Sequence, residues 1–278
     1  MLFPRVSEWI SIVAFAALMV LAWQRNLNRV RQAKVAGLGA AAIGVTVFAS
    51  MILPLAVPPA TASVVRDSVP CLLLLLFYSQ AGQFVTGADF ELEKRLERLD
   101  QRWLCRPLEW CSGRRIGVWI LTCLEAAYFY YYVSIPLSVG VLYWLGKQRD
   151  ADYFWTVVLV AAYGSCGMLP FIQTRPPRML GEKWSVCLPS GKVRTLNLWI
   201  LRHGSIQANT IPSAHVAIAT ASALALLEIA PLWVGLSFLG AAIGVALGAV
   251  AGRYHYAVDV ILGFALAAAA FLAVTAAW

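Results

Sequence analysis

Long apolar runs constrain the fold of this 278-residue chain more than any other feature of its sequence. A transmembrane helix needs roughly 17 to 25 predominantly apolar residues. Eight runs of about that length can be placed at 8–23, 35–56, 68–86, 116–145, 152–172, 212–230, 232–251 and 256–277. Hydrophobic residues make up 60% of the chain and charged residues only 13%, which excludes an ordinary soluble domain. The sequence therefore predicts an all-α, polytopic membrane helical bundle with about eight spans, placed in the cell (inner) membrane.

The runs divide the chain into two expected parts. Residues 1–60 hold an N-terminal pair of transmembrane helices, and residues 61–278 form a core. Within the core, residues 87–110 carry apolar side chains at mostly three- and four-residue steps. This spacing predicts an amphipathic helix at the membrane interface, ending near Pro107. Its polar positions mix acids and bases, which favours a solvated face with ion pairs one turn apart over a surface for anionic lipids.

Lysine and arginine are distributed unevenly among the loops. Eighteen of the 22 fall on one side of the expected membrane, within residues 24–34, 87–115 and 173–211 and at Arg253. The positive-inside rule makes that side cytoplasmic. However, a loop that binds phosphate is basic for a different reason, so the grouping of the loops is a firmer prediction than the compartment.

Two short segments place two of the three histidines at the starts of apolar runs. They are Pro212-Ser213-Ala214-His215 and Arg253-Tyr254-His255-Tyr256-Ala257-Val258-Asp259. The first turn of a helix offers unpaired N–H groups, and the helix dipole favours an anion there. Asp259 lies four residues after His255, so on a helix its carboxylate can orient the imidazole and stabilise the imidazole's cation. The pattern predicts phosphate chemistry at a membrane surface, although either histidine alone is as well explained by a helix cap or an ion pair.

A third segment places two arginines directly after an apolar run. In Gln173-Thr174-Arg175-Pro176-Pro177-Arg178 the prolines restrict the backbone. The guanidinium groups of Arg175 and Arg178 suit bidentate contacts to phosphate oxygens. Taken alone, such a segment is more typical of a basic turn that contacts lipid headgroups. Together with the histidine segments, it favours a phosphate site.

These three segments, in this order and each at a helix end, resemble the motifs of the type 2 phosphatidic acid phosphatase (PAP2) superfamily. Arg175-Pro176-Pro177-Arg178 is similar to the first motif, Pro212-Ser213-Ala214-His215 matches the second, and His255 with Asp259 matches the end of the third. The resemblance covers roughly residues 68–277 and implies a six-helix core, to which the two N-terminal helices are an addition.

The chain departs from the superfamily pattern at two positions. The lysine of the first motif falls on Met168, and the arginine of the third falls on Ala249. Arg253 instead stands two residues before His255, which gives an Arg-x-His-Tyr-x-x-Asp pattern similar to that of sphingomyelin and inositol-phosphorylceramide synthases. Hydrolysis and transfer to an alcohol both remain open for that reason.

The resemblance implies a role for each motif residue. His255 is the nucleophile that forms a phosphohistidine, Asp259 orients it, and His215 protonates the leaving alcohol. The phosphate oxygens are implied to contact the residues Arg175, Arg178, Ser213 and Arg253. This scheme needs no metal or other cofactor, and the sequence holds neither a carboxylate cluster nor a Cys-x-x-Cys pair to bind a metal.

The expected function is thus a metal-independent phosphatase whose partners are a membrane lipid phosphate and the bilayer, with no nucleic acid. One alternative is a phosphotransferase that moves a phospho-headgroup to inositol or a ceramide-like lipid. Another is a catalytically inactive lipid transporter or scaffold. The superfamily usually has its site on the extracytoplasmic face, against the charge bias, so the face stays open, as do the lipid and the oligomeric state.

Two further polar residues have expected roles. Glu125, inside a predicted span, either functions or hydrogen-bonds a tyrosine of the same span. His203 is expected to be an interfacial loop residue.

Overall fold

The computed structural model describes residues 4–112, 114–180 and 191–278, and every regular element in them is helical. The principal helices are α1 (Val6–Gln24), α2 (Arg29–Val47), α3 (Leu53–Ala56), α4 (Pro59–Gly82), α5 (Phe90–Ser112), α6 (Arg115–Trp144), α7 (Ala151–Cys166), α8 (Lys192–Gly204), α9 (Ala214–Ile229), α10 (Leu232–Ala251) and α11 (Ala257–Ala277). A π-helical turn, Phe48–Ile52, joins α2 to α3. The described residues contain no strand, only an isolated bridge between Thr174 and Asn209. The prediction of an all-α helical bundle is confirmed.

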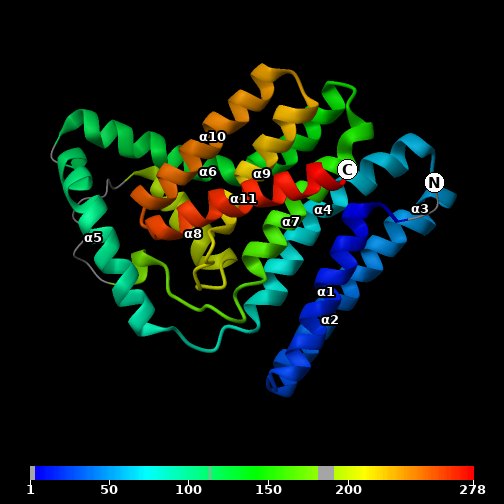
Figure 1. The fold of residues 1–278 in the computed structure, drawn as a ribbon, viewed down its shortest axis with the longest axis horizontal. Coiled ribbons are helices and arrows are strands. Elements are labelled where there is room, and N and C mark those ends of the chain that lie inside the picture. The colour runs from blue at the N-terminus through cyan, green and yellow to red at the C-terminus, as the bar shows by residue number, and fades with distance from the viewer. Residues whose placement is uncertain (1–3, 113, 181–190) are drawn as a thin grey trace.

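Helices α7 and α9 form the centre of the bundle (Figure 1). Helix α9 packs against α7, α10 and α11, while α7 also contacts α1 and α4. Almost every side chain of α7 is buried, including the fully buried Trp155. Helix α9 presents small side chains to its neighbours, among them the fully buried Ala217 and Ala221. Small residues let helix backbones approach closely, which is the usual basis of helix packing inside a membrane.

Six helices are long and apolar enough to cross a membrane: α1, the run from α2 through α3 (Arg29–Ala56), α4, α6, α10 and α11. These six support an integral membrane protein. The other two predicted spans are the central helices α7 and α9, each with 16 residues. A helix of that length rises only about 24 Å, against roughly 30 Å of hydrocarbon. The prediction that these two helices also cross the bilayer therefore stays a prediction.

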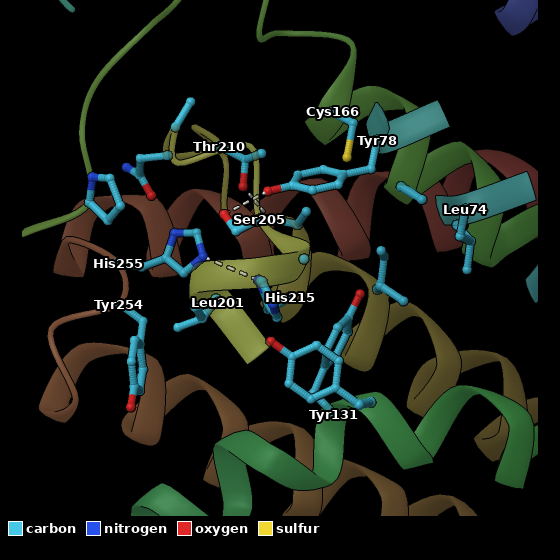
Figure 2. Close-up of a pocket in the computed structure, with 18 of the residues that line it drawn as sticks. Leu74, Tyr78, Tyr131, Cys166, Leu201, Ser205, Thr210, His215, Tyr254 and His255 are labelled. Atoms are coloured by element: carbon cyan, nitrogen blue, oxygen red, sulfur yellow. Dashed lines mark hydrogen bonds between the residues drawn. The ribbon is translucent and has the colours of Figure 1, made fainter. Parts of the chain in front are cut away.

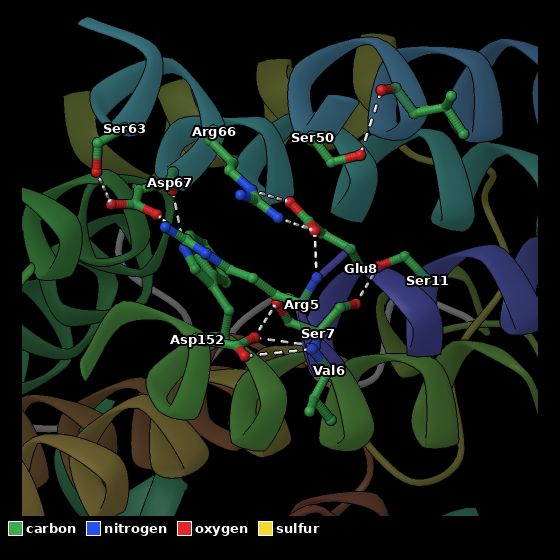
Figure 3. A network of polar contacts seen from close by, with 12 residues as sticks. Arg5, Val6, Ser7, Glu8, Ser11, Ser50, Ser63, Arg66, Asp67 and Asp152 are labelled. Carbon is green, nitrogen blue, oxygen red and sulfur yellow. Dashed lines mark hydrogen bonds and ion pairs between the residues drawn. The ribbon is translucent and has the colours of Figure 1, made fainter. Parts of the chain in front are cut away.

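A buried polar network attaches the start of α1 to the end of the bundle opposite the histidine segments (Figure 3). Arg66 Nε donates to Glu8 Oε1 at 2.5 Å, and Arg5 pairs with the fully buried Asp67. The carboxylate of Asp152, at the start of α7, accepts from the first backbone N–H groups of α1. The charges in α1 and α4 thus neutralise one another. Because these charges are paired, they can lie inside α4, which begins at Pro59, whereas the predicted span begins at residue 68.

Two amphipathic helices, α5 and α8, lie at the end of the bundle that holds the histidine segments. Their exposed aromatic side chains, including Trp103 on α5 and Trp199 on α8, suit a membrane interface. The prediction that Pro107 ends α5 is wrong, because the helix continues to Ser112; a proline removes one backbone hydrogen bond but need not end a helix. The acids of α5 are also not all solvated: Glu93 and Asp100 are buried.

Candidate active site

Backbone hydrogen bonds join the three motif segments at one end of the bundle. The N–H of Ser213 donates to the carbonyl of Asp259 at 2.9 Å, and the N–H of Arg178 donates to the carbonyl of Arg253 at 2.9 Å. Gly263, one turn after Asp259, permits the first contact, because a Cβ there would lie 2.9 Å from the Ser213 carbonyl oxygen. The structure thus brings together segments that are far apart in the sequence.

The two motif histidines face each other (Figure 2). Nε2 of His255 lies 3.3 Å from Nδ1 of His215. On the other side of the His255 ring, Nδ1 lies 3.7 Å from Oδ2 of the fully buried Asp259. That carboxylate oxygen also accepts from Asn209 Nδ2 at 2.6 Å and from the N–H of Tyr256 at 2.9 Å. Asp259 is therefore held in place behind His255, and the opposite ring nitrogen of His255 is directed at His215.

A cavity of about 300 Å³ opens beside this pair. His215, His255 and Arg178 contribute to its polar end. Helices α4, α7, α8 and α9 contribute apolar side chains such as Leu74, Phe77 and Ile218. The lining also includes six tyrosines: Tyr78, Tyr128, Tyr131, Tyr132, Tyr163 and Tyr254. A cavity with one polar end and a long apolar wall suits an amphiphilic ligand.

Arg178 is the arginine that lines the cavity in the described part of the chain. Among the side chains that the structure describes, no carboxylate forms an ion pair with its guanidinium. Burial lowers the pKa of Arg178, yet an arginine keeps its charge at any relevant pH. Burial, and secondarily the charge of Arg178, also lowers the pKa of His255 to about 3. His255 is therefore neutral at physiological pH, with a ring nitrogen available as a nucleophile.

The other two predicted arginines are held by acids of α5. Glu93 pairs with the guanidinium of Arg175 at 2.8 Å and also accepts from its backbone N–H at 2.6 Å. Arg253 is buried and donates to Asp100 and Glu97, both at 2.6 Å. Neither arginine lines the cavity. The structure therefore gives both of them a structural contact with α5, which the sequence did not predict.

The side chain of Ser213 caps α9. Its Oγ accepts from the N–H of Val216 at 3.5 Å, and the residue is fully buried. Ser213 is absent from the cavity lining, whereas its neighbours Ala214 and His215 are part of it. Its position therefore serves the first turn of α9 more directly than it serves a ligand.

Sequence reasoning missed several residues at the site. Asn209 has no motif around it, and only the fold brings its amide to Asp259. Glu125 is a candidate that the sequence does offer, either as a functional residue or as a partner of a tyrosine on its own helix, but its actual partners are not indicated by the sequence: it accepts from Arg194 at 2.5 Å, Asn197 at 2.8 Å and Tyr254 at 2.6 Å.

The remaining expectations concern His203 and metals. The prediction of a loop position for His203 is wrong: the residue is exposed in the last turn of α8, where its Nδ1 lies 2.8 Å from the carbonyl oxygen of Trp199. Among the described residues, no group of three or more His, Cys, Asp and Glu side chains is arranged to hold a metal ion. Metal independence itself stays a prediction.

The family assignment agrees with this geometry. The sequence pattern of the PAP2 superfamily matches residues 94–273, more than half of the chain, so the chain belongs to the PAP2 superfamily. No curated protein and no solved structure matches it. Membership indicates an enzyme with a phosphatase-type activity. The particular likeness to sphingomyelin and inositol-phosphorylceramide synthases stays a prediction.

Proposed function

We propose that this chain is a metal-independent membrane phosphatase that acts on a lipid phosphate through a phosphohistidine at His255. One observation carries the proposal. Nε2 of His255 and Nδ1 of His215 lie 3.3 Å apart at the polar end of a cavity whose wall is apolar, and Asp259 lies behind His255. A nucleophile, a second imidazole for proton transfer and an orienting acid are the groups that such a reaction needs.

In the first half of the reaction, Nε2 of His255 attacks the phosphorus atom and the bond from phosphorus to the lipid oxygen breaks. His215, in its protonated form, gives a proton to that oxygen, so the lipid leaves as a neutral alcohol. Asp259 stabilises the positive charge that His255 gains with the new N–P bond. In the second half, neutral His215 takes a proton from water, the water oxygen attacks phosphorus, and the N–P bond breaks to release phosphate and neutral His255.

Arg178 is the residue that we assign to direct contact with the phosphate oxygens, because its guanidinium lines the cavity without a described carboxylate partner. The free N–H groups in the first turn of α9 add to the same electrostatic stabilisation. We propose that Arg175, Arg253 and Ser213 support the phosphate site by shaping the loops and helix start around it. The apolar wall would hold the first part of the lipid chain while the rest stays in the bilayer.

Phosphotransfer to an alcohol is the second candidate function. The observation that favours it is the set of three tyrosines whose rings surround His215 and line the cavity, Tyr128, Tyr131 and Tyr132, because their hydroxyl groups suit an acceptor that carries hydroxyl groups. The same phosphohistidine would then be attacked by the acceptor alcohol in place of water. The third candidate, an inactive transporter or scaffold, requires none of the histidine geometry.

The test uses purified full-length protein in detergent with a panel of lipid phosphates, with and without EDTA. Released phosphate is measured by a colorimetric assay and new lipids by mass spectrometry. His255→Ala is compared with His203→Ala, a matched control because His203 is exposed and lies outside the cavity lining. Brief incubation with ³²P-labelled substrate and alkaline quenching tests for an alkali-stable phosphohistidine.

We expect phosphate release that survives EDTA, a covalent label on the wild type and on His203→Ala, and loss of both in His255→Ala. Product that appears only as a new lipid, after inositol or ceramide is added, would replace hydrolysis with transfer. Release that requires a metal would remove the phosphohistidine scheme. Wild-type protein that lacks both activities with every substrate would favour the transporter or scaffold.

A further inference from the structure

We propose that Tyr128 positions His215 for proton transfer, and that Glu125 holds Tyr128 in place through Tyr254. This inference rests on the proposed function, because it concerns the group that protonates the leaving alcohol. Tyr128, Glu125 and Tyr254 do not occupy the motif positions through which the chain resembles its superfamily.

Tyr128 makes two contacts with the imidazole of His215. Its hydroxyl lies 3.4 Å from Nε2 of His215, and the two rings stack with centroids 5.2 Å apart and planes inclined by 29°. The ring of Tyr131 approaches the same imidazole, with centroids 4.4 Å apart. Tyr128 is 1% exposed, so its own position is fixed by packing. The orientation of His215 is therefore set by α6 as well as by its own helix.

The hydroxyl contact also decides which nitrogen of His215 meets the substrate. Because Nε2 faces Tyr128, Nδ1 is the nitrogen that faces His255, where the phosphorus atom would lie. When a proton leaves or joins Nδ1, the proton on Nε2 stays in place, so the hydroxyl oxygen of Tyr128 accepts from Nε2–H in both the neutral and the protonated form of His215. The contact thus persists when His215 gives up its proton and when it takes one. Proton transfer in both halves of the reaction then occurs at Nδ1.

Glu125 supports this arrangement from one turn earlier on α6. Its Oε2 accepts from the hydroxyl of Tyr254 at 2.6 Å, and the ring of Tyr254 stacks on that of Tyr128 with centroids 4.1 Å apart and planes inclined by 19°. Arg194 and Asn197 of α8 hold the same carboxylate. Glu125 is buried, and a buried carboxylate in an apolar helix is costly unless it is paired. In this arrangement Glu125 holds Tyr254, and Tyr254 stacks on Tyr128, which contacts His215.

The experiment compares two leaving groups in the variant Tyr128→Phe. A lipid alcohol must be protonated as it leaves, whereas p-nitrophenolate leaves readily without a proton. If Tyr128 positions the proton donor His215, its replacement should slow hydrolysis of the lipid phosphate and have much less effect on hydrolysis of p-nitrophenyl phosphate. Tyr130→Phe is the matched control, because Tyr130 lies on the same helix outside the cavity lining. His215→Ala supplies the reference pattern for loss of the donor itself.

We expect Tyr128→Phe to lower kcat for the lipid phosphate about tenfold, the effect of one lost hydrogen bond in the transition state, with KM unchanged. The loss with p-nitrophenyl phosphate should be less than about threefold. Glu125→Gln should show the same pattern to a smaller degree, because glutamine still accepts from Tyr254. Tyr130→Phe should match the wild type with both substrates. Circular dichroism and gel filtration in detergent establish that each variant is folded.

An equal loss with both substrates would mean that Tyr128 has only a structural role and would overturn the inference. So would wild-type activity of folded Tyr128→Phe. In either case an active wild type with an inactive His255→Ala would leave the proposed function standing. A wild type that releases no phosphate from either substrate would overturn the proposed function, and this inference with it.

Discussion

Asp100 offers a sharp test of whether α5 holds the loop 252–256, which joins α10 to α11 and carries His255. Its carboxylate is fully buried and makes two contacts, one with the guanidinium of Arg253 at 2.6 Å and one with the N–H of Ala257 at 3.0 Å. Ala257 begins α11, two residues after His255. Replacing Asp100 with asparagine preserves the shape of the side chain and an acceptor for Ala257, but it removes the charge opposite Arg253.

The expected cost follows from burial. Removing one partner of a buried ion pair typically costs about 3 to 5 kcal/mol, because it leaves the other charge desolvated and less well compensated. Arg253 is 1% exposed, so that cost applies, but Glu97 also pairs with it and offsets part of the loss. We therefore expect Asp100→Asn to lower the free energy of unfolding by about 2 to 3 kcal/mol. For a chain of this size that corresponds to a fall in Tm of about 4 to 12 °C.

The assay is thermal unfolding in detergent, followed by tryptophan fluorescence. Glu91→Gln is the matched control, because Glu91 is also an α5 acid in an ion pair, with Lys94, but is 71% exposed at its side chain. We expect its Tm to match that of the wild type, since exposed pairs contribute little. If both variants unfold at the same temperature as the wild type, the buried contact does not hold the loop. Equal destabilisation by both would also refute the argument, because it would show that burial is not the cause.

Three further predictions test other parts of the structure. Because burial and the charge of Arg178 hold the pKa of His255 at about 3, protonation of His255 should not lower kcat/KM until the pH falls well below 6.5. The variant Arg178→Gln should raise the pKa of His255, so its kcat/KM should begin to fall at a higher pH than that of the wild type. Assays from pH 3 to 8 measure both profiles. Asn209→Ala removes the 2.6 Å donor to Asp259 and should lower kcat about tenfold in steady-state assays, with KM unchanged. Glu8→Gln should lower Tm by several degrees through the buried network at the opposite end, while the pH profile of the folded enzyme stays the same.

The sequence predicted the helical architecture well because apolar runs and helix length report directly on the membrane. The sequence-based prediction was wrong where a residue far away along the chain neutralises a charge. The predicted span at 68–86 excluded Arg66 and Asp67, since charges are costly in hydrocarbon. In the structure those charges are inside α4, where Glu8 and Arg5 of the N-terminal segment neutralise them. A pairing across about 60 residues leaves no local pattern in the sequence.

In the candidate site, too, contacts between residues close in the sequence could be predicted, and contacts that depend on the fold could not. His255 and Asp259 are four residues apart on the chain, so their pairing was visible as a spacing, and the structure places them at 3.7 Å. Only the fold brings Asn209 to Asp259 and Tyr128 to His215, and nothing next to either residue in the sequence marks it as a site residue. Likewise, Arg253 occupies a position typical of phosphate binding, and its carboxylate partners Glu97 and Asp100 become apparent only when α5 is placed beside it.

The pairing of Arg253 also connects α5 to the cation that faces the cavity. The carbonyl of Arg253 accepts from the backbone N–H of Arg178 at 2.9 Å, so the acids that hold Arg253 also help to position the backbone of Arg178. The superfamily's lysine and arginine positions are filled here by Met168 and Ala249, neither of which carries a charge. In the proposed site, phosphate binding then depends more on Arg178, whose backbone is linked through Arg253 to α5. Because the outer face of α5 carries exposed aromatic residues suited to the membrane interface, the helix that we expect to lie at the lipid surface is also the one that shapes the proposed phosphate site.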